Sequence, residues 1–516
     1  MYPGLHAAER PDHPAVIMAS SGARVTYSEL EARSNLLAHL LRSIGLMRQD
    51  HYAVFLENHS RFVECCSAGD RAGLYYTPVN SYLTARELAY IINNSLSKVL
   101  ITSQSRRAVA IEALRACPEV KLCLIVDGPG EGDRVRNLEE ATEGFPSTPI
   151  PDESRGSAFF YSSGTTGQPK GVLRPLPTES LTQPLPILDL WGKLFRYRPG
   201  QTYLSPAPLY HVAPLVGVAA SILAGGTAIV MERFDAVDFL RLVEQYHVTH
   251  CQLVPTMFSR MLKLPEATRR CYDLSSLEVA YHGAAPCPIP IKQAMIDWWG
   301  PIILEYYGAT EGMGLTYCDS AEWLAHKGTV GKTVAGELHI LDEEMKEVAP
   351  GKIGKLWFKT ASPFEYFNDP AKTAEANSPD RTMSTVGDIG HVDKEGYVYL
   401  TDRAAFMIIS SGVNIYPQEC ENLLVAHPKV ADAAVFGVPN EEMGEEVKAA
   451  VQLMPGFEPG EAMAAELIAY CRAHLAHLKC PRSIDFEAHF PRLPTGKLYK
   501  TPLRDRYWKG HAGRII

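Results

Sequence analysis

The sequence predicts an α/β protein with a large N-terminal domain of stacked α/β sheets and a small α+β C-terminal domain. Through most of the chain, short aliphatic or β-branched runs alternate with segments of helical length, which is typical of parallel sheets with covered faces. From about residue 332, short strands and turns replace this alternation, and a separate α+β pattern begins after Asp402-Arg403. We therefore expect a β-rich subdomain within domain 1–402, followed by domain 403–516.

The helices and strands are predicted from spacing and boundary residues. Thr26-Tyr27-Ser28-Glu29 and Ser28-Glu29-Leu30-Glu31 both fit a capping box, and apolar residues at helical spacing then run to Ile44. Further helices are expected over 237–246 and 462–475. Strands are expected at 52–56, 99–102, 122–126, 227–231, 250–254, 277–281, 302–305, 337–341, 355–359, 397–400, 431–438 and 447–453. Small-residue turns follow the strands at 277–281 and 302–305, where ligands of open α/β sheets bind.

Composition excludes several classes of function. The chain has 516 residues, 46% hydrophobic and 21% charged, which is ordinary for a globular protein of more than one domain. A net charge of −9 without a basic run argues against nucleic-acid binding. Neither a signal peptide nor an apolar stretch of about 20 residues is present, so we expect a cytoplasmic protein without stable membrane insertion. The eleven scattered cysteines predict reduced thiols rather than disulfides or a zinc site.

A glycine-rich loop runs from Tyr161 to Gly171 and combines hydroxyl side chains, glycines and one lysine directly after an apolar strand. Backbone N–H groups, hydroxyls and an ammonium suit a polyphosphate. The Walker pattern requires Gly-Lys-Ser/Thr, whereas Lys170 lies between Pro169 and Gly171. The loop therefore predicts a nucleotide site of another fold, with an ordinary surface turn as the alternative.

Four further motifs follow this loop in order: 306–312, 385–390, Asp402-Arg403 and Pro494-Thr495-Gly496-Lys497. Together the five motifs resemble the adenylate-forming superfamily of acyl-CoA synthetases, beetle luciferases and peptide-synthetase adenylation domains, over about 25–503. Segments 282–288 and 75–80 are similar to bacterial fatty-acyl and steroid-acyl CoA ligases. The resemblance implies ATP and coenzyme A as co-substrates and Mg²⁺ as the metal.

The resemblance also implies the nucleotide site. Thr310 would bind the α-phosphate and Glu311 would hold Mg²⁺, the alternative being a helix N-cap with an exposed glutamate. Tyr307 would stack on adenine, and Asp388 would bind the ribose, although Asp388 also suits a tight turn. The remaining predicted nucleotide-binding residues are Ser162, Ser163, Gly164, Thr165, Thr166, Gly167, Gly283, Ala284, Ala285, Glu305, Tyr306, Gly308 and Arg403.

Lys497 is the predicted mobile catalytic lysine, because it follows Thr-Gly as the family motif requires. Lys500 is the competing candidate, and Lys170 of the glycine loop is a second predicted catalytic residue. Ala405 occupies the hinge position, where the family usually has a charged or polar residue, and domain rotation is still expected. After rotation, the residues expected near coenzyme A are Ser410, Ser411, Gly412 and Val413.

His211 resembles the family's gate beside the acyl pocket, with a buried core histidine as the alternative. The other residues expected around this pocket are Tyr210, Val212, Val216, His282, Ala309, Gly312 and Gly314. The small residues predict a roomy floor, which favours a lipophilic acid such as a fatty, steroid-like or aryl acid. The sequence thus predicts an acyl-CoA synthetase that works through acyl-AMP. The alternatives are an enzyme that loads a carrier protein and a non-catalytic nucleotide sensor; a homodimer is left open.

Overall fold

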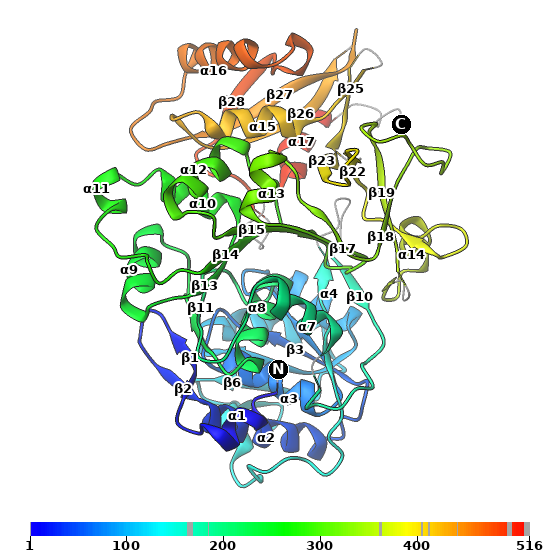
Figure 1. Ribbon diagram of the computed structural model, residues 1–516. Helices are drawn as coiled ribbons and strands as arrows, with labels where there is room; N and C mark the ends of the chain where they lie inside the picture. The colour runs from blue at the N-terminus through cyan, green and yellow to red at the C-terminus, as the bar shows by residue number, and fades with distance from the viewer. Residues whose placement is uncertain are drawn as a thin grey trace. The chain divides into compact units, whose positions relative to one another are not determined.

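The structure is a computed structural model that describes residues 2–162, 169–183, 185–360, 364–403, 406–410, 413–440, 442–492 and 498–509, with the side chains of 402 and 403 excepted. The chain forms two compact units (Figure 1). The first unit comprises 1–282, 302–304 and 364–373, and the second comprises 283–301, 305–363 and 374–516. In the described part of the chain, no helix has the length and apolar character needed to cross a bilayer.

The first unit contains a parallel six-stranded sheet in the order β7-β6-β5-β3-β4-β8. Its strands are β3 (His51–Phe55), β4 (Tyr75–Pro78), β5 (Ser97–Ser103), β6 (Leu122–Val126), β7 (Val135–Asn137) and β8 (Ser157–Ala158). Helices α4 (Ala85–Asn94) and α5 (Arg107–Leu114) pack their apolar faces into one core cluster with this sheet. The predicted strands at 52–56, 99–102 and 122–126 are therefore confirmed.

Helix α2 (Tyr27–Ser43) begins at the first of the two predicted capping boxes. The Thr26 side chain accepts the N–H of Glu29, and the Glu29 carboxylate accepts the N–H of Thr26. This reciprocal cap satisfies two N–H groups that a helix start otherwise leaves unpaired. Ile44 ends the helix, and Gly45 follows at φ +84°, a left-handed conformation that favours glycine.

Six strands of a second, nine-stranded sheet belong to the first unit, in the order β14-β13-β11-β12-β1-β2, and neighbours among these six are parallel except β1 and β2. These six strands are β1 (Pro14–Met18), β2 (Arg24–Thr26), β11 (Thr202–Ser205), β12 (Thr227–Val230), β13 (His250–Leu253) and β14 (Val279–His282). The helices beside it include α7 (Pro186–Leu194), α8 (Val212–Leu223), α9 (Ala236–Tyr246), α10 (Pro255–Leu262) and α11 (Glu266–Arg269). The other helices of this unit are α1 (Gly4–Glu9), α3 (Arg61–Arg71) and α6 (Leu138–Thr142).

The change of pattern predicted near residue 332 is confirmed in the second unit. Strands β18 (Glu337–Leu341), β19 (Gly354–Lys359), β22 (Asp388–Val392) and β23 (Val398–Arg403) form an antiparallel sheet, with β21 (Met383–Ser384) paired to β19. Strands β15 (Ile303–Gly308), β16 (Leu315–Cys318) and β17 (Lys332–Ala335) are also antiparallel. Further helices are α12 (Ile289–Trp299) and α13 (Ser320–Ala325), whereas α14 (Pro370–Ala376) has residues in both units.

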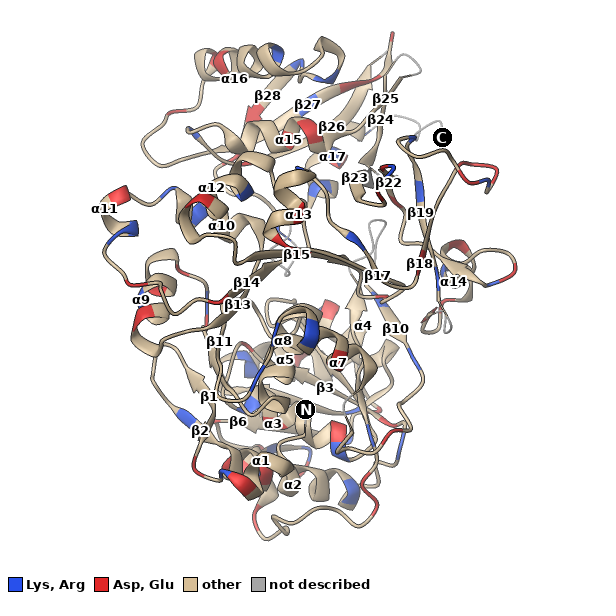
Figure 2. Ribbon diagram, viewed as in Figure 1, with Lys and Arg blue, Asp and Glu red and all other residues tan. Residues whose placement is uncertain are grey.

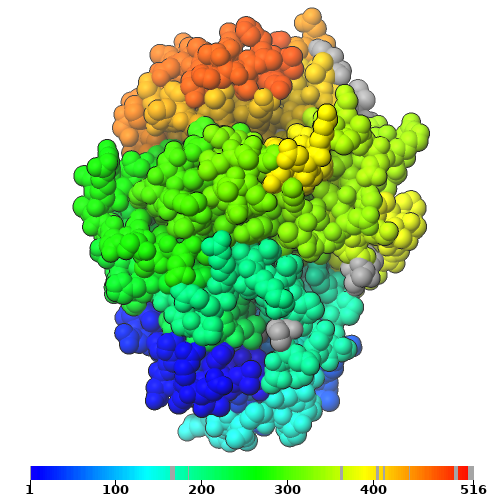
Figure 3. All heavy atoms as spheres, viewed as in Figure 1, coloured from blue at the N-terminus to red at the C-terminus, as the bar shows by residue number. Residues whose placement is uncertain are grey.

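The C-terminal segment has the predicted α+β pattern. Its sheet contains β24 (Ile408–Ser410), β25 (Val413–Ile415), β26 (Val430–Asn440), β27 (Gly444–Leu453) and β28 (Ser483–Phe486), and its helices are α15 (Pro417–Ala426), α16 (Glu461–His474) and α17 (Lys500–Trp508). Only Leu467 and Cys471 of α16 are buried, so the helix lies at the surface (Figure 3) and carries charges of both signs (Figure 2). All eleven cysteines of the chain are free thiols, and Cys271 alone is exposed.

Candidate active site

The turn that follows β14 has no room for a larger residue at its first position. A Cβ on Gly283 would lie 2.7 Å from Cζ and 2.8 Å from the carbonyl oxygen of Tyr306. Ala284, the next residue, adopts φ +67°, a conformation that costs an L-residue about 1–2 kcal/mol. The backbone of Gly283, the first residue of the predicted Gly283–Ala285 segment, therefore packs directly on Tyr306 of the strand 303–308.

Strands β15 and β16 form a hairpin whose connection holds Thr310 and Glu311. Gly308 pairs with Leu315, and the N–H of Gly312 donates to the carbonyl of Ala309 at 2.8 Å. Gly312 has φ +56°, the left-handed conformation that such a tight turn favours. Glu311 is only 6% exposed and lies in this turn, so the alternative of an exposed glutamate in a helix N-cap is wrong.

The predicted adenine and ribose residues are in direct contact. The Tyr307 hydroxyl donates a hydrogen bond to Oδ2 of Asp388 at 2.6 Å. Asp388 is 6% exposed and begins β22, where its backbone pairs with Arg403 of β23. The preceding turn is also present, because the Gly387 N–H donates to Oγ1 of Thr385 at 3.0 Å. Asp388 therefore both follows a tight turn and places its carboxylate beside Tyr307.

A buried ion pair that we did not predict adjoins these residues. Nζ of Lys292 on α12 lies 2.5 Å from Oε2 of Glu305, and the two side chains are 0% and 5% exposed. The same ammonium lies 4.8 Å from the ring centroid of Trp323. Burial raises the pKa of Glu305, and the Lys292 charge opposes this shift. The sequence signal for this ion pair is Lys292 itself, the one lysine among the largely apolar residues of α12.

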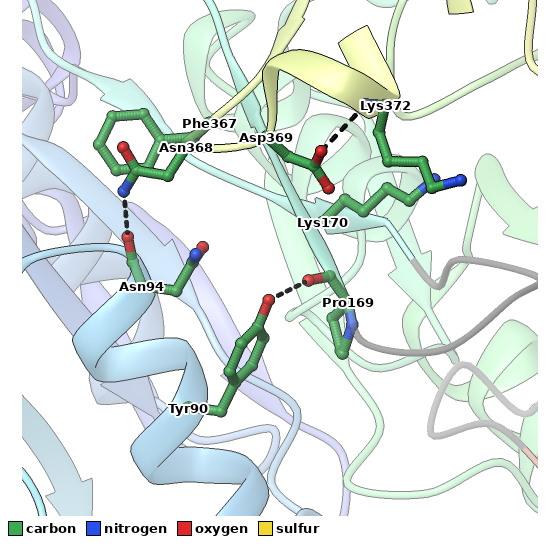
Figure 4. A pocket seen from close by; sticks show the side chains of 8 residues that line it. All are labelled: Tyr90, Asn94, Pro169, Lys170, Phe367, Asn368, Asp369 and Lys372. Carbon is green, nitrogen blue, oxygen red and sulfur yellow. Dashed lines mark hydrogen bonds between the residues drawn. The ribbon is translucent and has the colours of Figure 1, made fainter. Parts of the chain in front are cut away.

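Ser162 and Lys170 pair with each other in the hairpin of β9 (Tyr161–Ser162) and β10 (Lys170–Leu173), which leads into and out of the glycine loop. Strand β20 (Glu365–Tyr366) pairs with β10, and Nζ of Lys170 lies 4.7 Å from the ring centroid of Tyr366. A cavity of about 180 Å³ begins at this point. Figure 4 shows its lining of Tyr90, Asn94, Pro169, Lys170, Phe367, Asn368, Asp369 and Lys372.

Four of the predicted acyl-pocket residues lie at the start of α8. His211 occupies the N-cap position, with its ring centroid 4.6 Å from that of Tyr210. Val212 and Val216 are four residues apart on α8, which places them on one face, and both are half-buried. The structure therefore brings Tyr210, His211, Val212 and Val216 together.

His282 differs from this group. It is fully buried on β14, with its ring centroid 5.1 Å from that of Phe258 on α10. Its neighbour Tyr281 points to the other face of the strand, where its hydroxyl lies 2.8 Å from the position of a Cβ on Gly217 of α8. His282 thus faces α10, and its place in the acyl pocket stays a prediction.

Gly314 also differs from the expected open pocket floor. A Cβ at Gly314 would lie 2.0 Å from Cδ1 of Phe358, so the ring of Phe358 fills the space that the glycine leaves. Gly308 has more room, because its Cβ would meet Leu315 Cδ1 only at 3.2 Å. The absence of a side chain at Gly314 therefore allows Phe358 of β19 to pack closely, and it adds no volume to a pocket.

In the C-terminal segment, Ser410 and Val413 pair in the β24–β25 hairpin, with Ser410 buried and Val413 46% exposed. Lys500, the competing lysine, forms an ion pair with Glu421 at 2.6 Å, and its side chain is 10% exposed. Several predicted residues lie outside the described residues: Ser163, Gly164, Thr165, Thr166, Gly167, Ala405, Ser411, Gly412, Lys497 and the side chain of Arg403.

The chain is similar to known ligases along nearly its whole length. FadD13, a long-chain-fatty-acid–CoA ligase of Mycobacterium tuberculosis, is 31% identical and covers 97% of both chains. The fatty acid–[acyl-carrier-protein] ligase ScoC of Streptomyces coeruleorubidus is 31% identical, covering 99% of this chain and 96% of its own. A Rhodococcus jostii ligase that joins a methyl-dioxo-octahydroindenyl propanoyl group to CoA is 30% identical over 97% of both chains.

Solved structures and family models agree with these relatives. The o-succinylbenzoate CoA synthetase MenE of Bacillus subtilis, in complex with its acyl-adenylate, has a TM-score of 0.81 at 26% identity, covering 98% of this chain and 97% of its own. The AMP-binding enzyme model matches residues 5–366, and the AMP-binding enzyme C-terminal domain model matches residues 419–497. The chain therefore belongs to the AMP-binding enzyme family and is an adenylate-forming ligase.

Proposed function

We propose that the protein is an ATP-dependent acyl-CoA synthetase that activates a lipophilic carboxylic acid as acyl-AMP and transfers the acyl group to coenzyme A. The observation that carries this proposal is the hydrogen bond between Tyr307 and Asp388 beside the turn of Thr310 and Glu311. The second unit contains all the residues concerned. Tyr307 would supply the aromatic face for adenine, Asp388 would accept from the ribose, and the turn of Thr310 and Glu311 would bind phosphate and metal. Several relatives are named as acyl-CoA ligases, which supports the same reaction.

In the first half-reaction, the acid attacks the α-phosphate of ATP and pyrophosphate leaves. Catalysis of such transfers depends on positioning and on neutralising charge. Thr310 would donate to the α-phosphate, Lys497 would neutralise charge on the reacting oxygens, and Lys170 with the glycine loop would bind the departing phosphates. Glu311 fits a magnesium site, because Mg²⁺ is usually held by one or two carboxylates together with substrate phosphates. When bound, the ion would supply positive charge at those oxygens.

In the second half-reaction, the thiol of coenzyme A displaces AMP after the C-terminal domain has rotated. Residues 410–413 would then lie beside the pantetheine channel. We place the domain boundary at residue 402 and the hinge at Ala405, between the family matches at 5–366 and 419–497. No covalent enzyme intermediate is required.

Ala405→Pro is expected to retain acyl-AMP formation and to lose thioester formation from supplied acyl-AMP by at least about tenfold. Proline fixes φ near −65° and removes the freedom that rotation needs. Each half-reaction is measured alone, with Ala405→Gly as the control that keeps this freedom. Full thioester formation in the proline variant would show that residue 405 is not the hinge.

Tyr307→Phe is expected to raise KM for ATP about tenfold with little change in kcat. The variant leaves the Asp388 carboxylate without its 2.6 Å donor, and a hydrogen bond to a charged group contributes about 1.5–3 kcal/mol. Tyr399→Phe is a matched control, because Tyr399 donates to Asp393 at 3.2 Å on the same sheet. An equal rise in KM in both variants would contradict a specific nucleotide role.

The acceptor and the acid are tested by one experiment. Pyrophosphate release is measured with fatty, steroid-like and aryl acids, with and without coenzyme A. We expect release with a lipophilic acid and formation of its CoA thioester. Acyl-AMP without a CoA thioester would indicate a carrier-protein loader, the activity for which ScoC is named. No release with any acid would indicate a nucleotide sensor. We also propose that the protein acts in the cytoplasm and does not insert stably into a membrane.

A further inference from the structure

The cavity drawn in Figure 4 has no role in the proposed reaction so far. Its lining residues all belong to the first unit and come from α4, from residues 169–170 and from residues 367–372. Its volume of about 180 Å³ equals the share of about six waters in the liquid, at about 30 Å³ each. Pockets that enclose drug-sized ligands usually have about 300–1,000 Å³. The cavity therefore has room for a small ion and is too small for a nucleotide.

Hydrogen bonds between these three segments fix the walls of the cavity. The Tyr90 hydroxyl donates to the carbonyl oxygen of Pro169 at 3.2 Å, which joins α4 to the residue before β10. Nδ2 of Asn368 donates to the carbonyl oxygen of Asn94 at 3.4 Å, which joins α4 to the segment 367–372. The cavity is therefore held by contacts between segments that are far apart in the sequence.

The lining of the cavity is suited to an anion. It carries two positive charges, on Lys170 and Lys372, against one negative charge on Asp369. Oδ1 of Asp369 accepts the backbone N–H of Lys372 at 3.0 Å. The Asn94 carboxamide, which points into the cavity in Figure 4, accepts the Tyr161 hydroxyl through Oδ1 at 2.6 Å, so its Nδ2 is the donor on the other side. Two ammonium groups and an oriented amide donor favour phosphate oxygens as the ligand.

Lys170 connects this cavity to the proposed reaction. It belongs to the glycine loop 161–171, which is expected to bind the phosphates that leave as pyrophosphate. Its Nζ lies 4.7 Å from the ring centroid of Tyr366, a cation–π contact that holds the ammonium at the cavity. Pyrophosphate has a charged phosphate group at each end and can contact Lys170 and Lys372 at once. Inorganic phosphate has only one such group.

We propose that the cavity is a release site that holds pyrophosphate after it leaves the glycine loop. Lys170 and Lys372 neutralise its charge, and Nδ2 of Asn94 donates to one of its oxygens. Binding in the cavity removes pyrophosphate from the reacting phosphate and so opposes reversal of acyl-AMP formation. This inference rests on the proposed function, because that reaction supplies the pyrophosphate.

The test measures pyrophosphate binding by calorimetry, at low salt because ions screen exposed charges. Lys372→Met and Asn94→Asp are each expected to weaken pyrophosphate binding at least tenfold and to change the dissociation constant of ATP less than twofold. Asn94→Asp keeps the oxygen that accepts the Tyr161 hydroxyl and replaces the amide donor with a negative charge. Lys372→Arg keeps the positive charge and is expected to retain pyrophosphate affinity within threefold.

Lys193→Met is the matched control, because Lys193 is another lysine of the first unit, paired with Asp189 at 2.6 Å on α7. It is expected to leave both affinities unchanged. An unchanged pyrophosphate affinity in Lys372→Met or in Asn94→Asp would overturn the proposal. Equal weakening of ATP and pyrophosphate would also overturn it, because the cavity would then be part of the ATP site. Should Lys372→Met fail to fold, Asn94→Asp decides alone.

Failure of the proposed function gives a different result. In that case the wild-type protein releases no pyrophosphate with any acid, whereas binding of added pyrophosphate can still be measured by calorimetry. Inorganic phosphate is expected to bind the wild type at least tenfold more weakly than pyrophosphate does. Equal affinity for the two ions, or no binding of pyrophosphate by an active synthetase, would overturn the inference independently of the reaction.

Discussion

Lys497→Ala is expected to abolish acyl-AMP formation while thioester formation from supplied acyl-AMP continues. The first half-reaction gathers negative charge on the carboxylate and α-phosphate oxygens, and a fixed cation there typically contributes about 10²–10³ in rate. In the second half-reaction the thiol displaces AMP after this lysine has left the site. Loss of this one ammonium should therefore impair the first half-reaction and spare the second.

The measurement follows pyrophosphate exchange for the first step and release of AMP from synthetic acyl-AMP for the second. Lys500→Met is the control, because Lys500 forms its ion pair with Glu421 and should affect stability more than adenylation. An equal loss of both half-reactions in Lys497→Ala would contradict the proposed role. Loss of adenylation in Lys500→Met at normal folded content would transfer the role to that residue.

Glu311→Gln is expected to reduce acyl-AMP formation by about 10²–10³ and to raise the magnesium concentration required for half-maximal rate. The substitution conserves size and removes one negative charge from the turn that follows β15. A neutral amide binds Mg²⁺ more weakly than a carboxylate does. The loss should therefore be relieved in part by more magnesium, a dependence that a change in packing would not produce.

The matched control is Glu322→Gln. Glu322 is part of the capping box of α13, where it accepts the N–H of Asp319 at 3.1 Å. This control should lower stability and leave the magnesium dependence unchanged. A uniform loss of rate in Glu311→Gln at every magnesium concentration would show that Glu311 does not hold the metal.

Much of the fold could be predicted because local patterns agree with the tertiary structure. The helix after Thr26 begins at a capping box, and the strands at 250–254 and 447–453 lie within a few residues of β13 and β27. Strand β11 was missed, because its four residues Thr202–Ser205 include only two strongly apolar ones. Short buried strands of this kind are specified by their neighbours rather than by their own pattern.

Residues of the candidate site that lie in a sequence motif could be predicted. Contacts between residues far apart in the sequence and outside any motif could not. The contact of Tyr307 with Asp388 joins two motifs, each recognisable alone. The pairing of Lys292 with Glu305 and the packing of Phe358 on Gly314 are tertiary contacts without a local signature. The surroundings of His282 have no local signature either, because a strand has two faces and only tertiary packing places His282 beside Phe258 of α10.

The distribution of thiols has a practical consequence for following the proposed domain rotation. Cys271 is exposed, whereas Cys287 is half-buried and the other nine are buried. Burial raises the pKa of thiols such as Cys66, Cys251 and Cys287, which keeps them protonated and slow to react. A maleimide dye should therefore attach to the native protein at one position. A single added cysteine in the C-terminal domain would then complete a fluorescent distance reporter, without a cysteine-free background.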